Sequence, residues 1–211
     1  MPEMLTSLKA ILRPARCALL IVDLQHDFVH RNGWGARHNP AAQSLRHVIP
    51  VANRLIAAGR DAGVLVCYLT MEHGPGLDAP NYRARYAVRD MDGDILCAAG
   101  GWGAQLDAEV LPPQPGDVRV VRHSYDGFAG TPLDARLRAD GREAVVAAGV
   151  VTNLCVQTTV QHAFALGYYV VVAEDGTAST SEAVQAMTLD NFRQFFGAVV
   201  PGDAIVRYWR R

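Results

Sequence analysis

Residues 144–156 have the sequence AVVAAGVVTNLCV, and this stretch decides the fold expected for the chain. Its first part, residues 144–148, is an apolar run of the length typical of a strand buried on both faces. Residues 157–166 follow with the character of a helix. The stretch therefore predicts a strand that leads into a helix, with Cys155 in the first turn of that helix.

The predicted place of Cys155 supports two interpretations. Free backbone N–H groups and the positive end of the helix dipole favour a thiolate there, and the thiolate is the nucleophilic form of cysteine. The other interpretation is a buried structural cysteine, which is the commoner fate of a single Cys. This segment alone leaves both interpretations open.

Apolar strands alternate with helices along the rest of the chain. We expect further strands at residues 17–22, 64–70, 118–121, 168–173 and 198–200, and helices at 41–62, 105–110, 131–139 and 181–195. Thr131 is the expected N-cap of its helix, with Pro132 at the first helical position. The alternation predicts an α/β fold, in which a parallel sheet carries helices on both faces.

A long segment interrupts this alternation. Residues 74–103 are rich in Gly, Pro, Asn and Asp, and predict a loop with little regular structure. A loop of this length in a compact domain is usually functional. We therefore expect residues 71–103 to set the specificity of any site nearby.

Three polar residues fall where strands end. Asp23 ends the first predicted strand, Arg122 ends the third, and Cys155 follows the fourth. Parallel α/β sheets bind ligands in the crevice outside the carboxyl ends of their strands. If the first and fourth strands are neighbours, Asp23 and Cys155 face each other across that crevice.

Composition limits the classes of partner. The 211 residues suit one domain, residues 1–211, and half of them are hydrophobic. The net charge of −1 gives no indication of nucleic acid or an anionic membrane as a partner. We find no signal-peptide core and no apolar run long enough to span a bilayer. Scattered cysteines without C-x-x-C spacing predict a cytoplasmic setting and no zinc site; they are Cys17, Cys67, Cys97 and Cys155.

The chain resembles the isochorismatase-like cysteine hydrolase family over nearly its whole length. The main matching segments are residues 23–25 (DLQ), 125–133 (YDGFAGTPL) and 149–156 (GVVTNLCV). Within that family it looks most like the ureidoacrylate amidohydrolases, through residues 80–82 (PNY), 113–117 (PQPGD) and 195–197 (FFG). The resemblance implies a Rossmann-like, doubly wound sheet of six mainly parallel strands, and a homodimer or homotetramer.

The resemblance also implies roles for individual residues. Cys155 matches the nucleophile, and Asp23 matches the acid/base that takes the thiol proton and later delivers it to the leaving amine. The backbone N–H groups of Val151 and Cys155 match the oxyanion hole. A cis peptide bond would fall between Val150 and Val151.

One catalytic position departs from the family pattern, because its lysine falls on Arg122. Arginine stays charged and cannot shuttle a proton, but it can hold the Asp23 carboxylate and stabilise a thiolate. No other lysine can take the role, since Lys9 is the only one in the chain and precedes the first strand. Arg122 therefore marks an altered substrate, a slow enzyme or a lost activity.

The pocket walls are expected on loops near the crevice. Gln25 matches a family position that shapes the site, and the other candidate substrate contacts are Phe28, Trp34, His73, Asn81, Tyr82 and Tyr125. An ordinary buried amide or core aromatics would explain these residues equally well. Residues 71–74 (MEHG) carry one histidine where metal-binding relatives have a cluster, so we expect no metal and no cofactor.

The favoured function is a cofactor-free hydrolase of a small amide, urea or N-carbamoyl compound. Hydrolysis of a vinyl ether of the isochorismate type is a weaker alternative, because enzymes of that type need not keep the cysteine. A catalytically silent small-molecule-binding protein is the alternative of another class, and Arg122 is its only support.

Overall fold

The computed structural model describes residues 4–88 and 93–210. Its centre is a six-stranded sheet in which all paired strands are parallel, in the order β3-β2-β1-β4-β5-β6. The strands are β1 (Cys17–Val22), β2 (Leu65–Met71), β3 (Val118–Arg122), β4 (Ala144–Val150), β5 (Tyr169–Ala178) and β6 (Gly197–Val200). The predicted Rossmann-like α/β fold is confirmed, and the order reverses between β1 and β4 as a doubly wound sheet requires.

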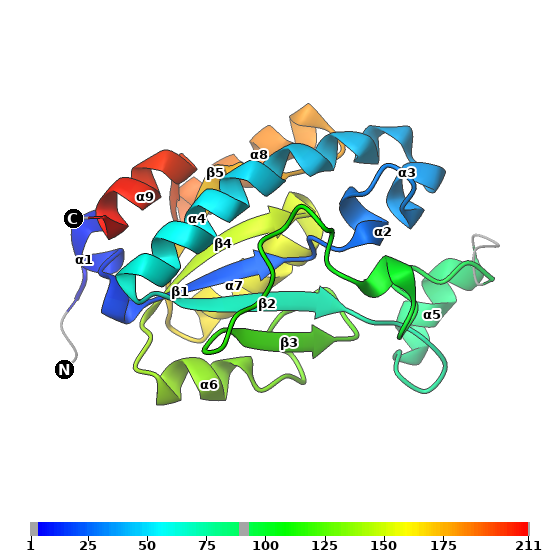
Figure 1. Ribbon diagram of the computed structural model, residues 1–211, viewed down its shortest axis with the longest axis horizontal. Helices are drawn as coiled ribbons and strands as arrows, with labels where there is room; N and C mark the ends of the chain where they lie inside the picture. Colours follow the sequence, from blue (N-terminus) through cyan, green and yellow to red (C-terminus); the bar gives the residue numbers. More distant parts are fainter. Residues whose placement is uncertain (1–3, 89–92, 211) are drawn as a thin grey trace.

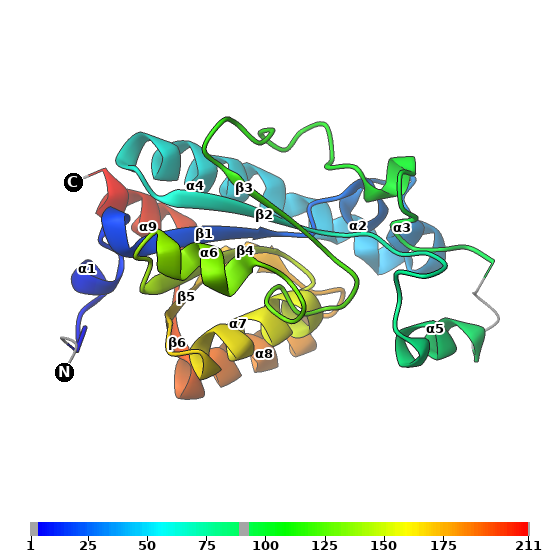
Figure 2. The ribbon, with the colours of Figure 1, turned by 90° about the horizontal axis from the view of Figure 1, so that it is seen from below.

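Helices cover both faces of the sheet. In Figure 2, α4 (Ile49–Ala62) and α9 (Gly202–Trp209) lie on one side, and α7 (Gln157–Ala165) and α8 (Glu182–Phe195) lie on the other. The remaining helices are α1 (Leu8–Ile11), α2 (His26–Val29), α3 (Trp34–His38), α5 (Pro80–Ala87) and α6 (Leu133–Ala139). Figure 1 shows α2, α3 and α5 beyond the carboxyl ends of the strands, at the end opposite to both termini.

The core follows from the all-apolar composition of the central strands. Every residue of β1 and β4 is buried, so these strands need no polar alternation. Burying one Val, Leu or Ile side chain contributes roughly 1.5–3 kcal/mol, so the valines, leucines and isoleucine of these two strands stabilise the centre of the sheet. The carboxyl ends of β1 and β4 are therefore a rigid support for any site built on them.

Several predicted boundaries shift in the structure. The helix expected at 41–62 is a 3₁₀ segment, Pro40–Val48, followed by α4, and Pro50 lies in the first turn of α4, where its missing N–H costs nothing. Gly63 ends this helix as predicted, with a φ of 81°. Residues 105–110 form bends and a turn instead of the predicted helix, and Leu106 makes an isolated antiparallel bridge to Gln25.

Among the described residues, the segment 74–103 differs most from its predicted structure. The structure places α5 (Pro80–Ala87) and a 3₁₀ turn, Trp102–Ala104, where a loop is predicted. Residues 89–92 of the predicted loop lie outside the described part. Pro80 opens α5 at the first helical position, which proline tolerates.

Smaller differences concern the ends of elements. Helix α6 begins at Leu133, so Pro132 takes the N-cap position predicted for Thr131, although the Thr131 hydroxyl still accepts a bond from the Leu133 N–H at 3.3 Å. Strand β5 continues to Ala178, and α9 was not predicted. Among the described residues, no helix has the length and apolar character needed to cross a membrane.

Candidate active site

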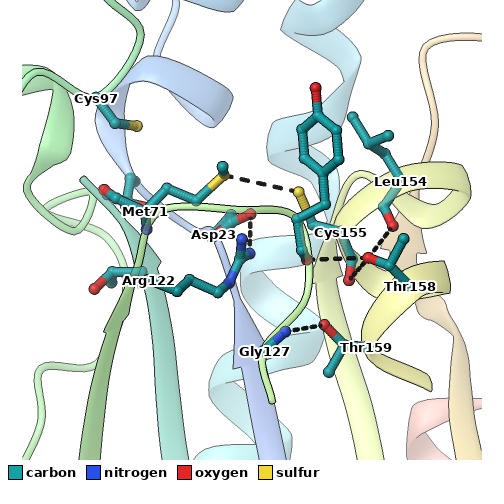
Figure 3. A network of polar contacts seen from close by, with 12 residues as sticks. Asp23, Met71, Cys97, Arg122, Gly127, Leu154, Cys155, Thr158 and Thr159 are labelled. Carbon is teal, nitrogen blue, oxygen red and sulfur yellow. Dashed lines mark hydrogen bonds and ion pairs between the residues drawn. The ribbon is translucent and has the colours of Figure 1, made fainter. Parts of the chain in front are cut away.

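Asp23, Arg122 and Cys155 come together at the carboxyl edge of the sheet. Asp23 directly follows β1, Arg122 is the last residue of β3, and Cys155 lies in the turn after β4. Figure 3 shows the side chains meeting from these separate strands. The predicted convergence is therefore present, because β1 and β4 are neighbours in the sheet.

The backbone around Asp23 is held in an uncommon conformation. Its φ of 50° is in the left-handed region, which non-glycine residues seldom adopt. The Asp23 N–H donates to the carbonyl of Leu69 in β2 at 3.0 Å, which fixes the end of β1 against its neighbour. Such outliers persist only where the surrounding structure holds them, and they cluster at functional sites.

Close approach of β4 to β1 depends on Gly149. A Cβ atom at this position would lie 2.0 Å from the carbonyl oxygen of Val22, and the residue has a φ of 123°. Only glycine meets both conditions. The peptide bond between Val150 and Val151 is cis, as the family resemblance implied.

A buried ion pair forms the polar centre of the site. The Nη2 atom of Arg122 donates to Oδ2 of Asp23 at 2.6 Å, and both side chains are fully buried. Arg122 extends from β3 past the end of β2 to reach Asp23, and its Nη1 also donates to the Ser124 carbonyl. Only a long side chain can span an intervening strand, and the forked guanidinium serves both acceptors at once.

Burial and the ion pair have opposite effects on Asp23. Burial raises the pKa of this carboxyl group, and the positive charge of Arg122 opposes that rise without cancelling it. On Arg122, burial disfavours the charge, but the Asp23 carboxylate outweighs burial, and the pKa of Arg122 is raised. Arg122 is therefore a permanent cation, whereas Asp23 is a carboxyl group that can take up a proton.

The Cys155 thiol is enclosed by these groups. Its Sγ lies 3.9 Å from the Met71 sulfur, and the residue has no exposed surface. Burial raises the pKa of the thiol, the Asp23 charge raises it further, and the Arg122 charge opposes both. Burial therefore opposes the thiolate that the end of the helix favours.

The turn that carries Cys155 is wider than an α-helical turn. Residues Thr152–Val156 form a single π-helical turn, and α7 begins only at Gln157. The Val151 carbonyl accepts from the N–H groups of Leu154 at 3.0 Å and Val156 at 3.3 Å, on either side of Cys155. Such turns are frequent at functional sites.

The motif at residues 125–133 packs on this turn. The Thr158 hydroxyl lies 3.0 Å from the Tyr125 carbonyl and 3.3 Å from the Cys155 carbonyl. The Gly127 N–H donates to the Thr159 hydroxyl at 2.9 Å (Figure 3). A Cβ at Gly127 would lie 2.8 Å from a Leu69 methyl group, so the motif fits tightly between β2 and α7.

Comparison with known proteins decides the family. The family model of the isochorismatase domain matches residues 17–204. The chain belongs to the isochorismatase family.

Individual relatives agree with this family assignment. Ureidoacrylate amidohydrolase RutB of Klebsiella variicola (strain At-22) is 35% identical over 213 residues, covering 94% of this chain and 86% of that protein. A cysteine hydrolase structure from Pseudomonas syringae pv. phaseolicola 1448A has a TM-score of 0.84 and 27% identity, covering 100% of this chain and 99% of that one. N-carbamoylsarcosine amidase from Thermoplasma acidophilum has a TM-score of 0.72 and 30% identity, covering 88% and 95% respectively. The predicted resemblance is confirmed.

Gln25 has a structural role in this isochorismatase-family fold. Its amide nitrogen donates to the carbonyls of Met71 and Ala104, each at 2.7 Å, and its oxygen accepts from the Met71 N–H at 2.8 Å. The side chain is fully buried. Gln25 therefore ties the end of β2 to the segment at residue 104, which matches the alternative of a buried amide.

Three other predicted contacts have no hydrogen bond or ion pair to the triad of Asp23, Arg122 and Cys155 in the described part of the chain. Phe28 is buried in the hydrophobic core. Trp34 stacks on His38 with 4.0 Å between ring centroids, and its indole N–H donates to the Asp94 carbonyl at 2.8 Å. Asn81 is exposed in the first turn of α5. For Phe28, the alternative of core packing fits the structure.

An aromatic group lies beside the triad and consists of His73, Tyr82 and Tyr125. The His73 ring stacks on Tyr82 at 4.3 Å, and the Tyr82 ring lies 5.5 Å from that of Tyr125. The two ring nitrogens of His73 are bonded to Asp78 at 2.6 Å and to the Tyr82 hydroxyl at 2.9 Å. Burial lowers the pKa of His73, and the bond to Asp78 opposes that shift, so the ring is neutral.

Sequence reasoning missed Arg85 and Tyr86, which complete this aromatic group. Both lie on α5, three and four residues after Tyr82, so one helix face carries all three side chains. The spacing was visible in the sequence, but it has meaning only for a helix, and this segment was predicted to be a loop. In the described part of the chain, no group of three or more His, Cys, Asp or Glu residues is arranged to hold a metal.

Proposed function

We propose that this protein hydrolyses a C–N bond of a small amide, urea or N-carbamoyl compound, with Cys155 as the nucleophile. The observation that carries the proposal is the buried pair of Asp23 and Arg122, 2.6 Å apart, against the buried Cys155 thiol at the carboxyl edge of the sheet. The names of two relatives, ureidoacrylate amidohydrolase and N-carbamoylsarcosine amidase, support this class of substrate.

In the first step, Asp23 takes the thiol proton as the Cys155 sulfur attacks the substrate carbonyl carbon. A new C–S bond forms, and the carbonyl oxygen becomes an oxyanion. The backbone N–H groups of Val151 and Cys155 stabilise that oxyanion. The raised pKa of Asp23 suits this task, because a carboxylate of ordinary pKa is a weaker base toward a thiol.

In the second step, the C–N bond breaks and the leaving nitrogen takes the proton from Asp23. An acyl- or carbamoyl-thioester remains on Cys155. Asp23, again ionised, removes a proton from a water molecule, which attacks the thioester carbonyl. The acid is released, and the proton returns to the Cys155 sulfur.

Arginine can serve this cycle without moving a proton. Before proton transfer the negative charge is on Asp23, and afterwards it is on Cys155 or the oxyanion, so the site keeps one negative charge throughout. The permanent cation of Arg122 balances that charge in each state, since its raised pKa prevents deprotonation. In this scheme a proton-shuttling lysine is not required, which argues against the catalytically silent alternative.

The test is a substrate screen with ammonia release as the readout. The panel contains primary amides, alkylureas and N-carbamoyl acids, each incubated with the wild-type protein and with a Cys155→Ser variant. We expect wild-type turnover of at least one compound and none by the variant. Failure of every C–N substrate, or equal release by both proteins, would contradict the proposal.

A further inference from the structure

Asp27 is a buried carboxylate that holds two separate segments of the chain by their backbones. It lies in α2 and is 6% exposed. Its Oδ1 accepts from the Trp34 N–H at 2.9 Å, and its Oδ2 accepts from the Cys97 N–H at 2.7 Å. A buried carboxylate is costly unless hydrogen bonds satisfy it, and bonds to a charged oxygen are stronger than neutral ones. Asp27 therefore fixes Trp34 and Cys97 relative to α2.

The backbone at Cys97 and the packing at Gly103 both depend on this carboxylate. Cys97 has a φ of 49°, in the left-handed region that non-glycine residues seldom adopt, and the bond from its N–H to Asp27 helps to hold it there. A Cβ atom at Gly103 would lie 2.1 Å from Oδ2 of Asp27, so glycine lets this backbone pass directly beside the carboxylate. The segment 97–103 is thus folded against Asp27.

The two segments that Asp27 holds also fix residues 95–96. The indole N–H of Trp34 donates to the Asp94 carbonyl at 2.8 Å, and three residues later Asp27 accepts from the Cys97 N–H. Residues 95–96 lie between these two points of attachment, and both attachments lead back to Asp27. This carboxylate therefore controls where residues 95–96 are placed.

The same segment is bound to the end of β2 beside the triad. The His73 N–H donates to the Cys97 carbonyl at 3.0 Å, and the Ala99 N–H donates to the His73 carbonyl at 2.9 Å. His73 comes two residues after Met71, whose sulfur lies 3.9 Å from the Cys155 Sγ. The segment held by Asp27 is therefore continuous, through backbone bonds, with the strand end that contacts the nucleophile.

A pocket of about 440 Å³ lies against this segment. Ile95 and Leu96 line it, together with Tyr82 and Tyr86 of α5 and with His73. The side chains of the triad have almost no exposed surface, so a substrate needs a cavity that leads toward them. His73 belongs both to this pocket and to the strand end beside Cys155, which makes the pocket the place for the part of a substrate that extends from the reacting carbonyl.

We propose that Asp27 is a positioning residue that sets the size of the group this pocket admits. The inference rests on the function proposed above, in which Cys155 is the reacting group. Asp27 acts through the backbone of residues 94–97 and so through the pocket wall that Ile95 and Leu96 form. When one of its two bonds is lost, this wall relaxes and larger groups reach the thiol.

Alkylation of Cys155 by two reagents of different size tests this proposal without hydrolytic turnover. Iodoacetamide and the larger 2-iodo-N-phenylacetamide react with the same thiolate, so the ratio of their rates reports access and is independent of the thiol pKa. Each rate is measured at Cys155 by peptide mass spectrometry and is divided by the rate of that reagent with glutathione.

The main variant is Asp27→Asn, which keeps the volume of the side chain. Its amide has a single acceptor oxygen, so one of the two N–H groups loses its partner. We expect the normalised rate of the larger reagent, relative to iodoacetamide, to rise about fivefold, the effect of one hydrogen bond. Trp34→Phe removes only the indole bond to the Asp94 carbonyl and keeps a large ring, so the ratio should rise by a smaller factor.

Asp107→Asn is the matched control. Asp107 is also a buried carboxylate, but it bonds to the Arg46 guanidinium and the Glu109 N–H, and it does not line this pocket. Its substitution disturbs a buried carboxylate of the same kind, and the ratio should stay near the wild-type value. Circular dichroism and the melting temperature identify the variants that are folded.

An unchanged ratio in folded Asp27→Asn, or an equal rise in Asp107→Asn, would overturn the role of Asp27. If Asp27→Asn does not fold, an unchanged ratio in Trp34→Phe would overturn it. With any substrate that the protein cleaves, Asp27→Asn should raise KM about fivefold and change kcat less than about threefold. A fall in kcat at constant KM would contradict a positioning role. Failure of every C–N substrate would contradict the proposed function alone, because a raised alkylation ratio would still support Asp27.

Discussion

The carboxyl edge between β1 and β4 and the α5 segment beside it hold their polar groups in different ways. At the edge, Asp23 and Arg122 form an ion pair without solvent exposure, on strands whose register is fixed on both sides. On α5, Arg85 is held by aromatic faces on an eight-residue helix that carries a single buried residue, Tyr82. The edge is part of the sheet, whereas Tyr82 of α5 contacts His73 and Tyr125, which follow β2 and β3.

This difference separates reaction chemistry from recognition. A change at the edge alters charges that the core has already desolvated, so it affects the chemical step. A change on α5 alters contacts to a ligand and leaves the ion pair in place. Substitutions at the edge should therefore lower kcat, whereas substitutions on α5 should raise KM.

The largest effect is expected for Asp23→Asn. The amide can neither take the thiol proton nor deliver it to the leaving nitrogen, so kcat should fall by about 10³-fold or more, toward the upper range for general acid–base catalysis. Steady-state kinetics and the melting temperature of the variant check this. An unchanged kcat with an unchanged pH–rate profile would make Asp23 a structural residue.

The next effect concerns the charge of Arg122. Asp23 must be ionised to act as a base, so activity is present above its pKa and is lost as the pH falls through it. Arg122 opposes the rise that burial causes in this pKa. Arg122→Met should therefore move the acidic limb of the pH–rate profile to higher pH and lower kcat by about 10²-fold at neutral pH.

Arg122→Lys is the matched control for that prediction. It keeps the charge and restores the side chain implied by the family, so hydrolysis should be retained or increased. A profile whose acidic limb is the same in wild type, Met and Lys variants would show that Arg122 does not control Asp23.

A stability effect is expected for Gln25→Leu. The substitution leaves the Met71 N–H and the carbonyls of Met71 and Ala104 without their partner, at a cost of about 2–4 kcal/mol of unfolding free energy. Urea denaturation measures this cost. Gln194→Leu on the exposed surface of α8 is the control and should change stability by less than about 0.5 kcal/mol. A similar small change for Gln25→Leu would refute its role in tying β2 to residue 104.

The smallest effect is expected for Tyr82→Phe. His73 loses the hydroxyl bonded to its Nε2, while the ring stack remains, so KM should rise about fivefold, the effect of one neutral hydrogen bond. Tyr169→Phe is the control, because it removes a hydroxyl that is bonded to the Leu5 N–H, outside the candidate site. A fall in kcat as large as that of Asp23→Asn would place Tyr82 in the chemical step and remove the division between the two regions.

The carboxyl edge was predicted well, because each of its polar residues can be recognised from the strand directly before it in the sequence. Apolar runs mark β1 and β4, and a short valine-rich segment marks β3. The polar residue that follows or ends each strand must lie at the carboxyl edge of a parallel sheet. The pairing of Asp23 with Arg122 then depends only on strand order. The helix-end argument for a Cys155 thiolate considers the turn alone and omits the burial of the thiol, which raises its pKa.

The α5 segment was poorly predicted, because some of its side chains contact residues that come from another part of the sequence, such as Tyr125 after β3. Residues 80–87 have weak helical amphipathicity, since a single residue of α5, Tyr82, is buried. The importance of Arg85 depends on Tyr125, which comes from a distant part of the chain. No local pattern shows that these residues meet.

The central claim is that Cys155 performs the chemical step, and replacement of its sulfur tests this most directly. Turnover of an identified substrate is measured for wild type, Cys155→Ser and Cys155→Ala, with circular dichroism and melting temperature as controls of folding. We predict loss of detectable turnover in both variants and a retained fold, because neither side chain can supply the thiolate nucleophile. Activity of either folded variant within tenfold of wild type would contradict the account.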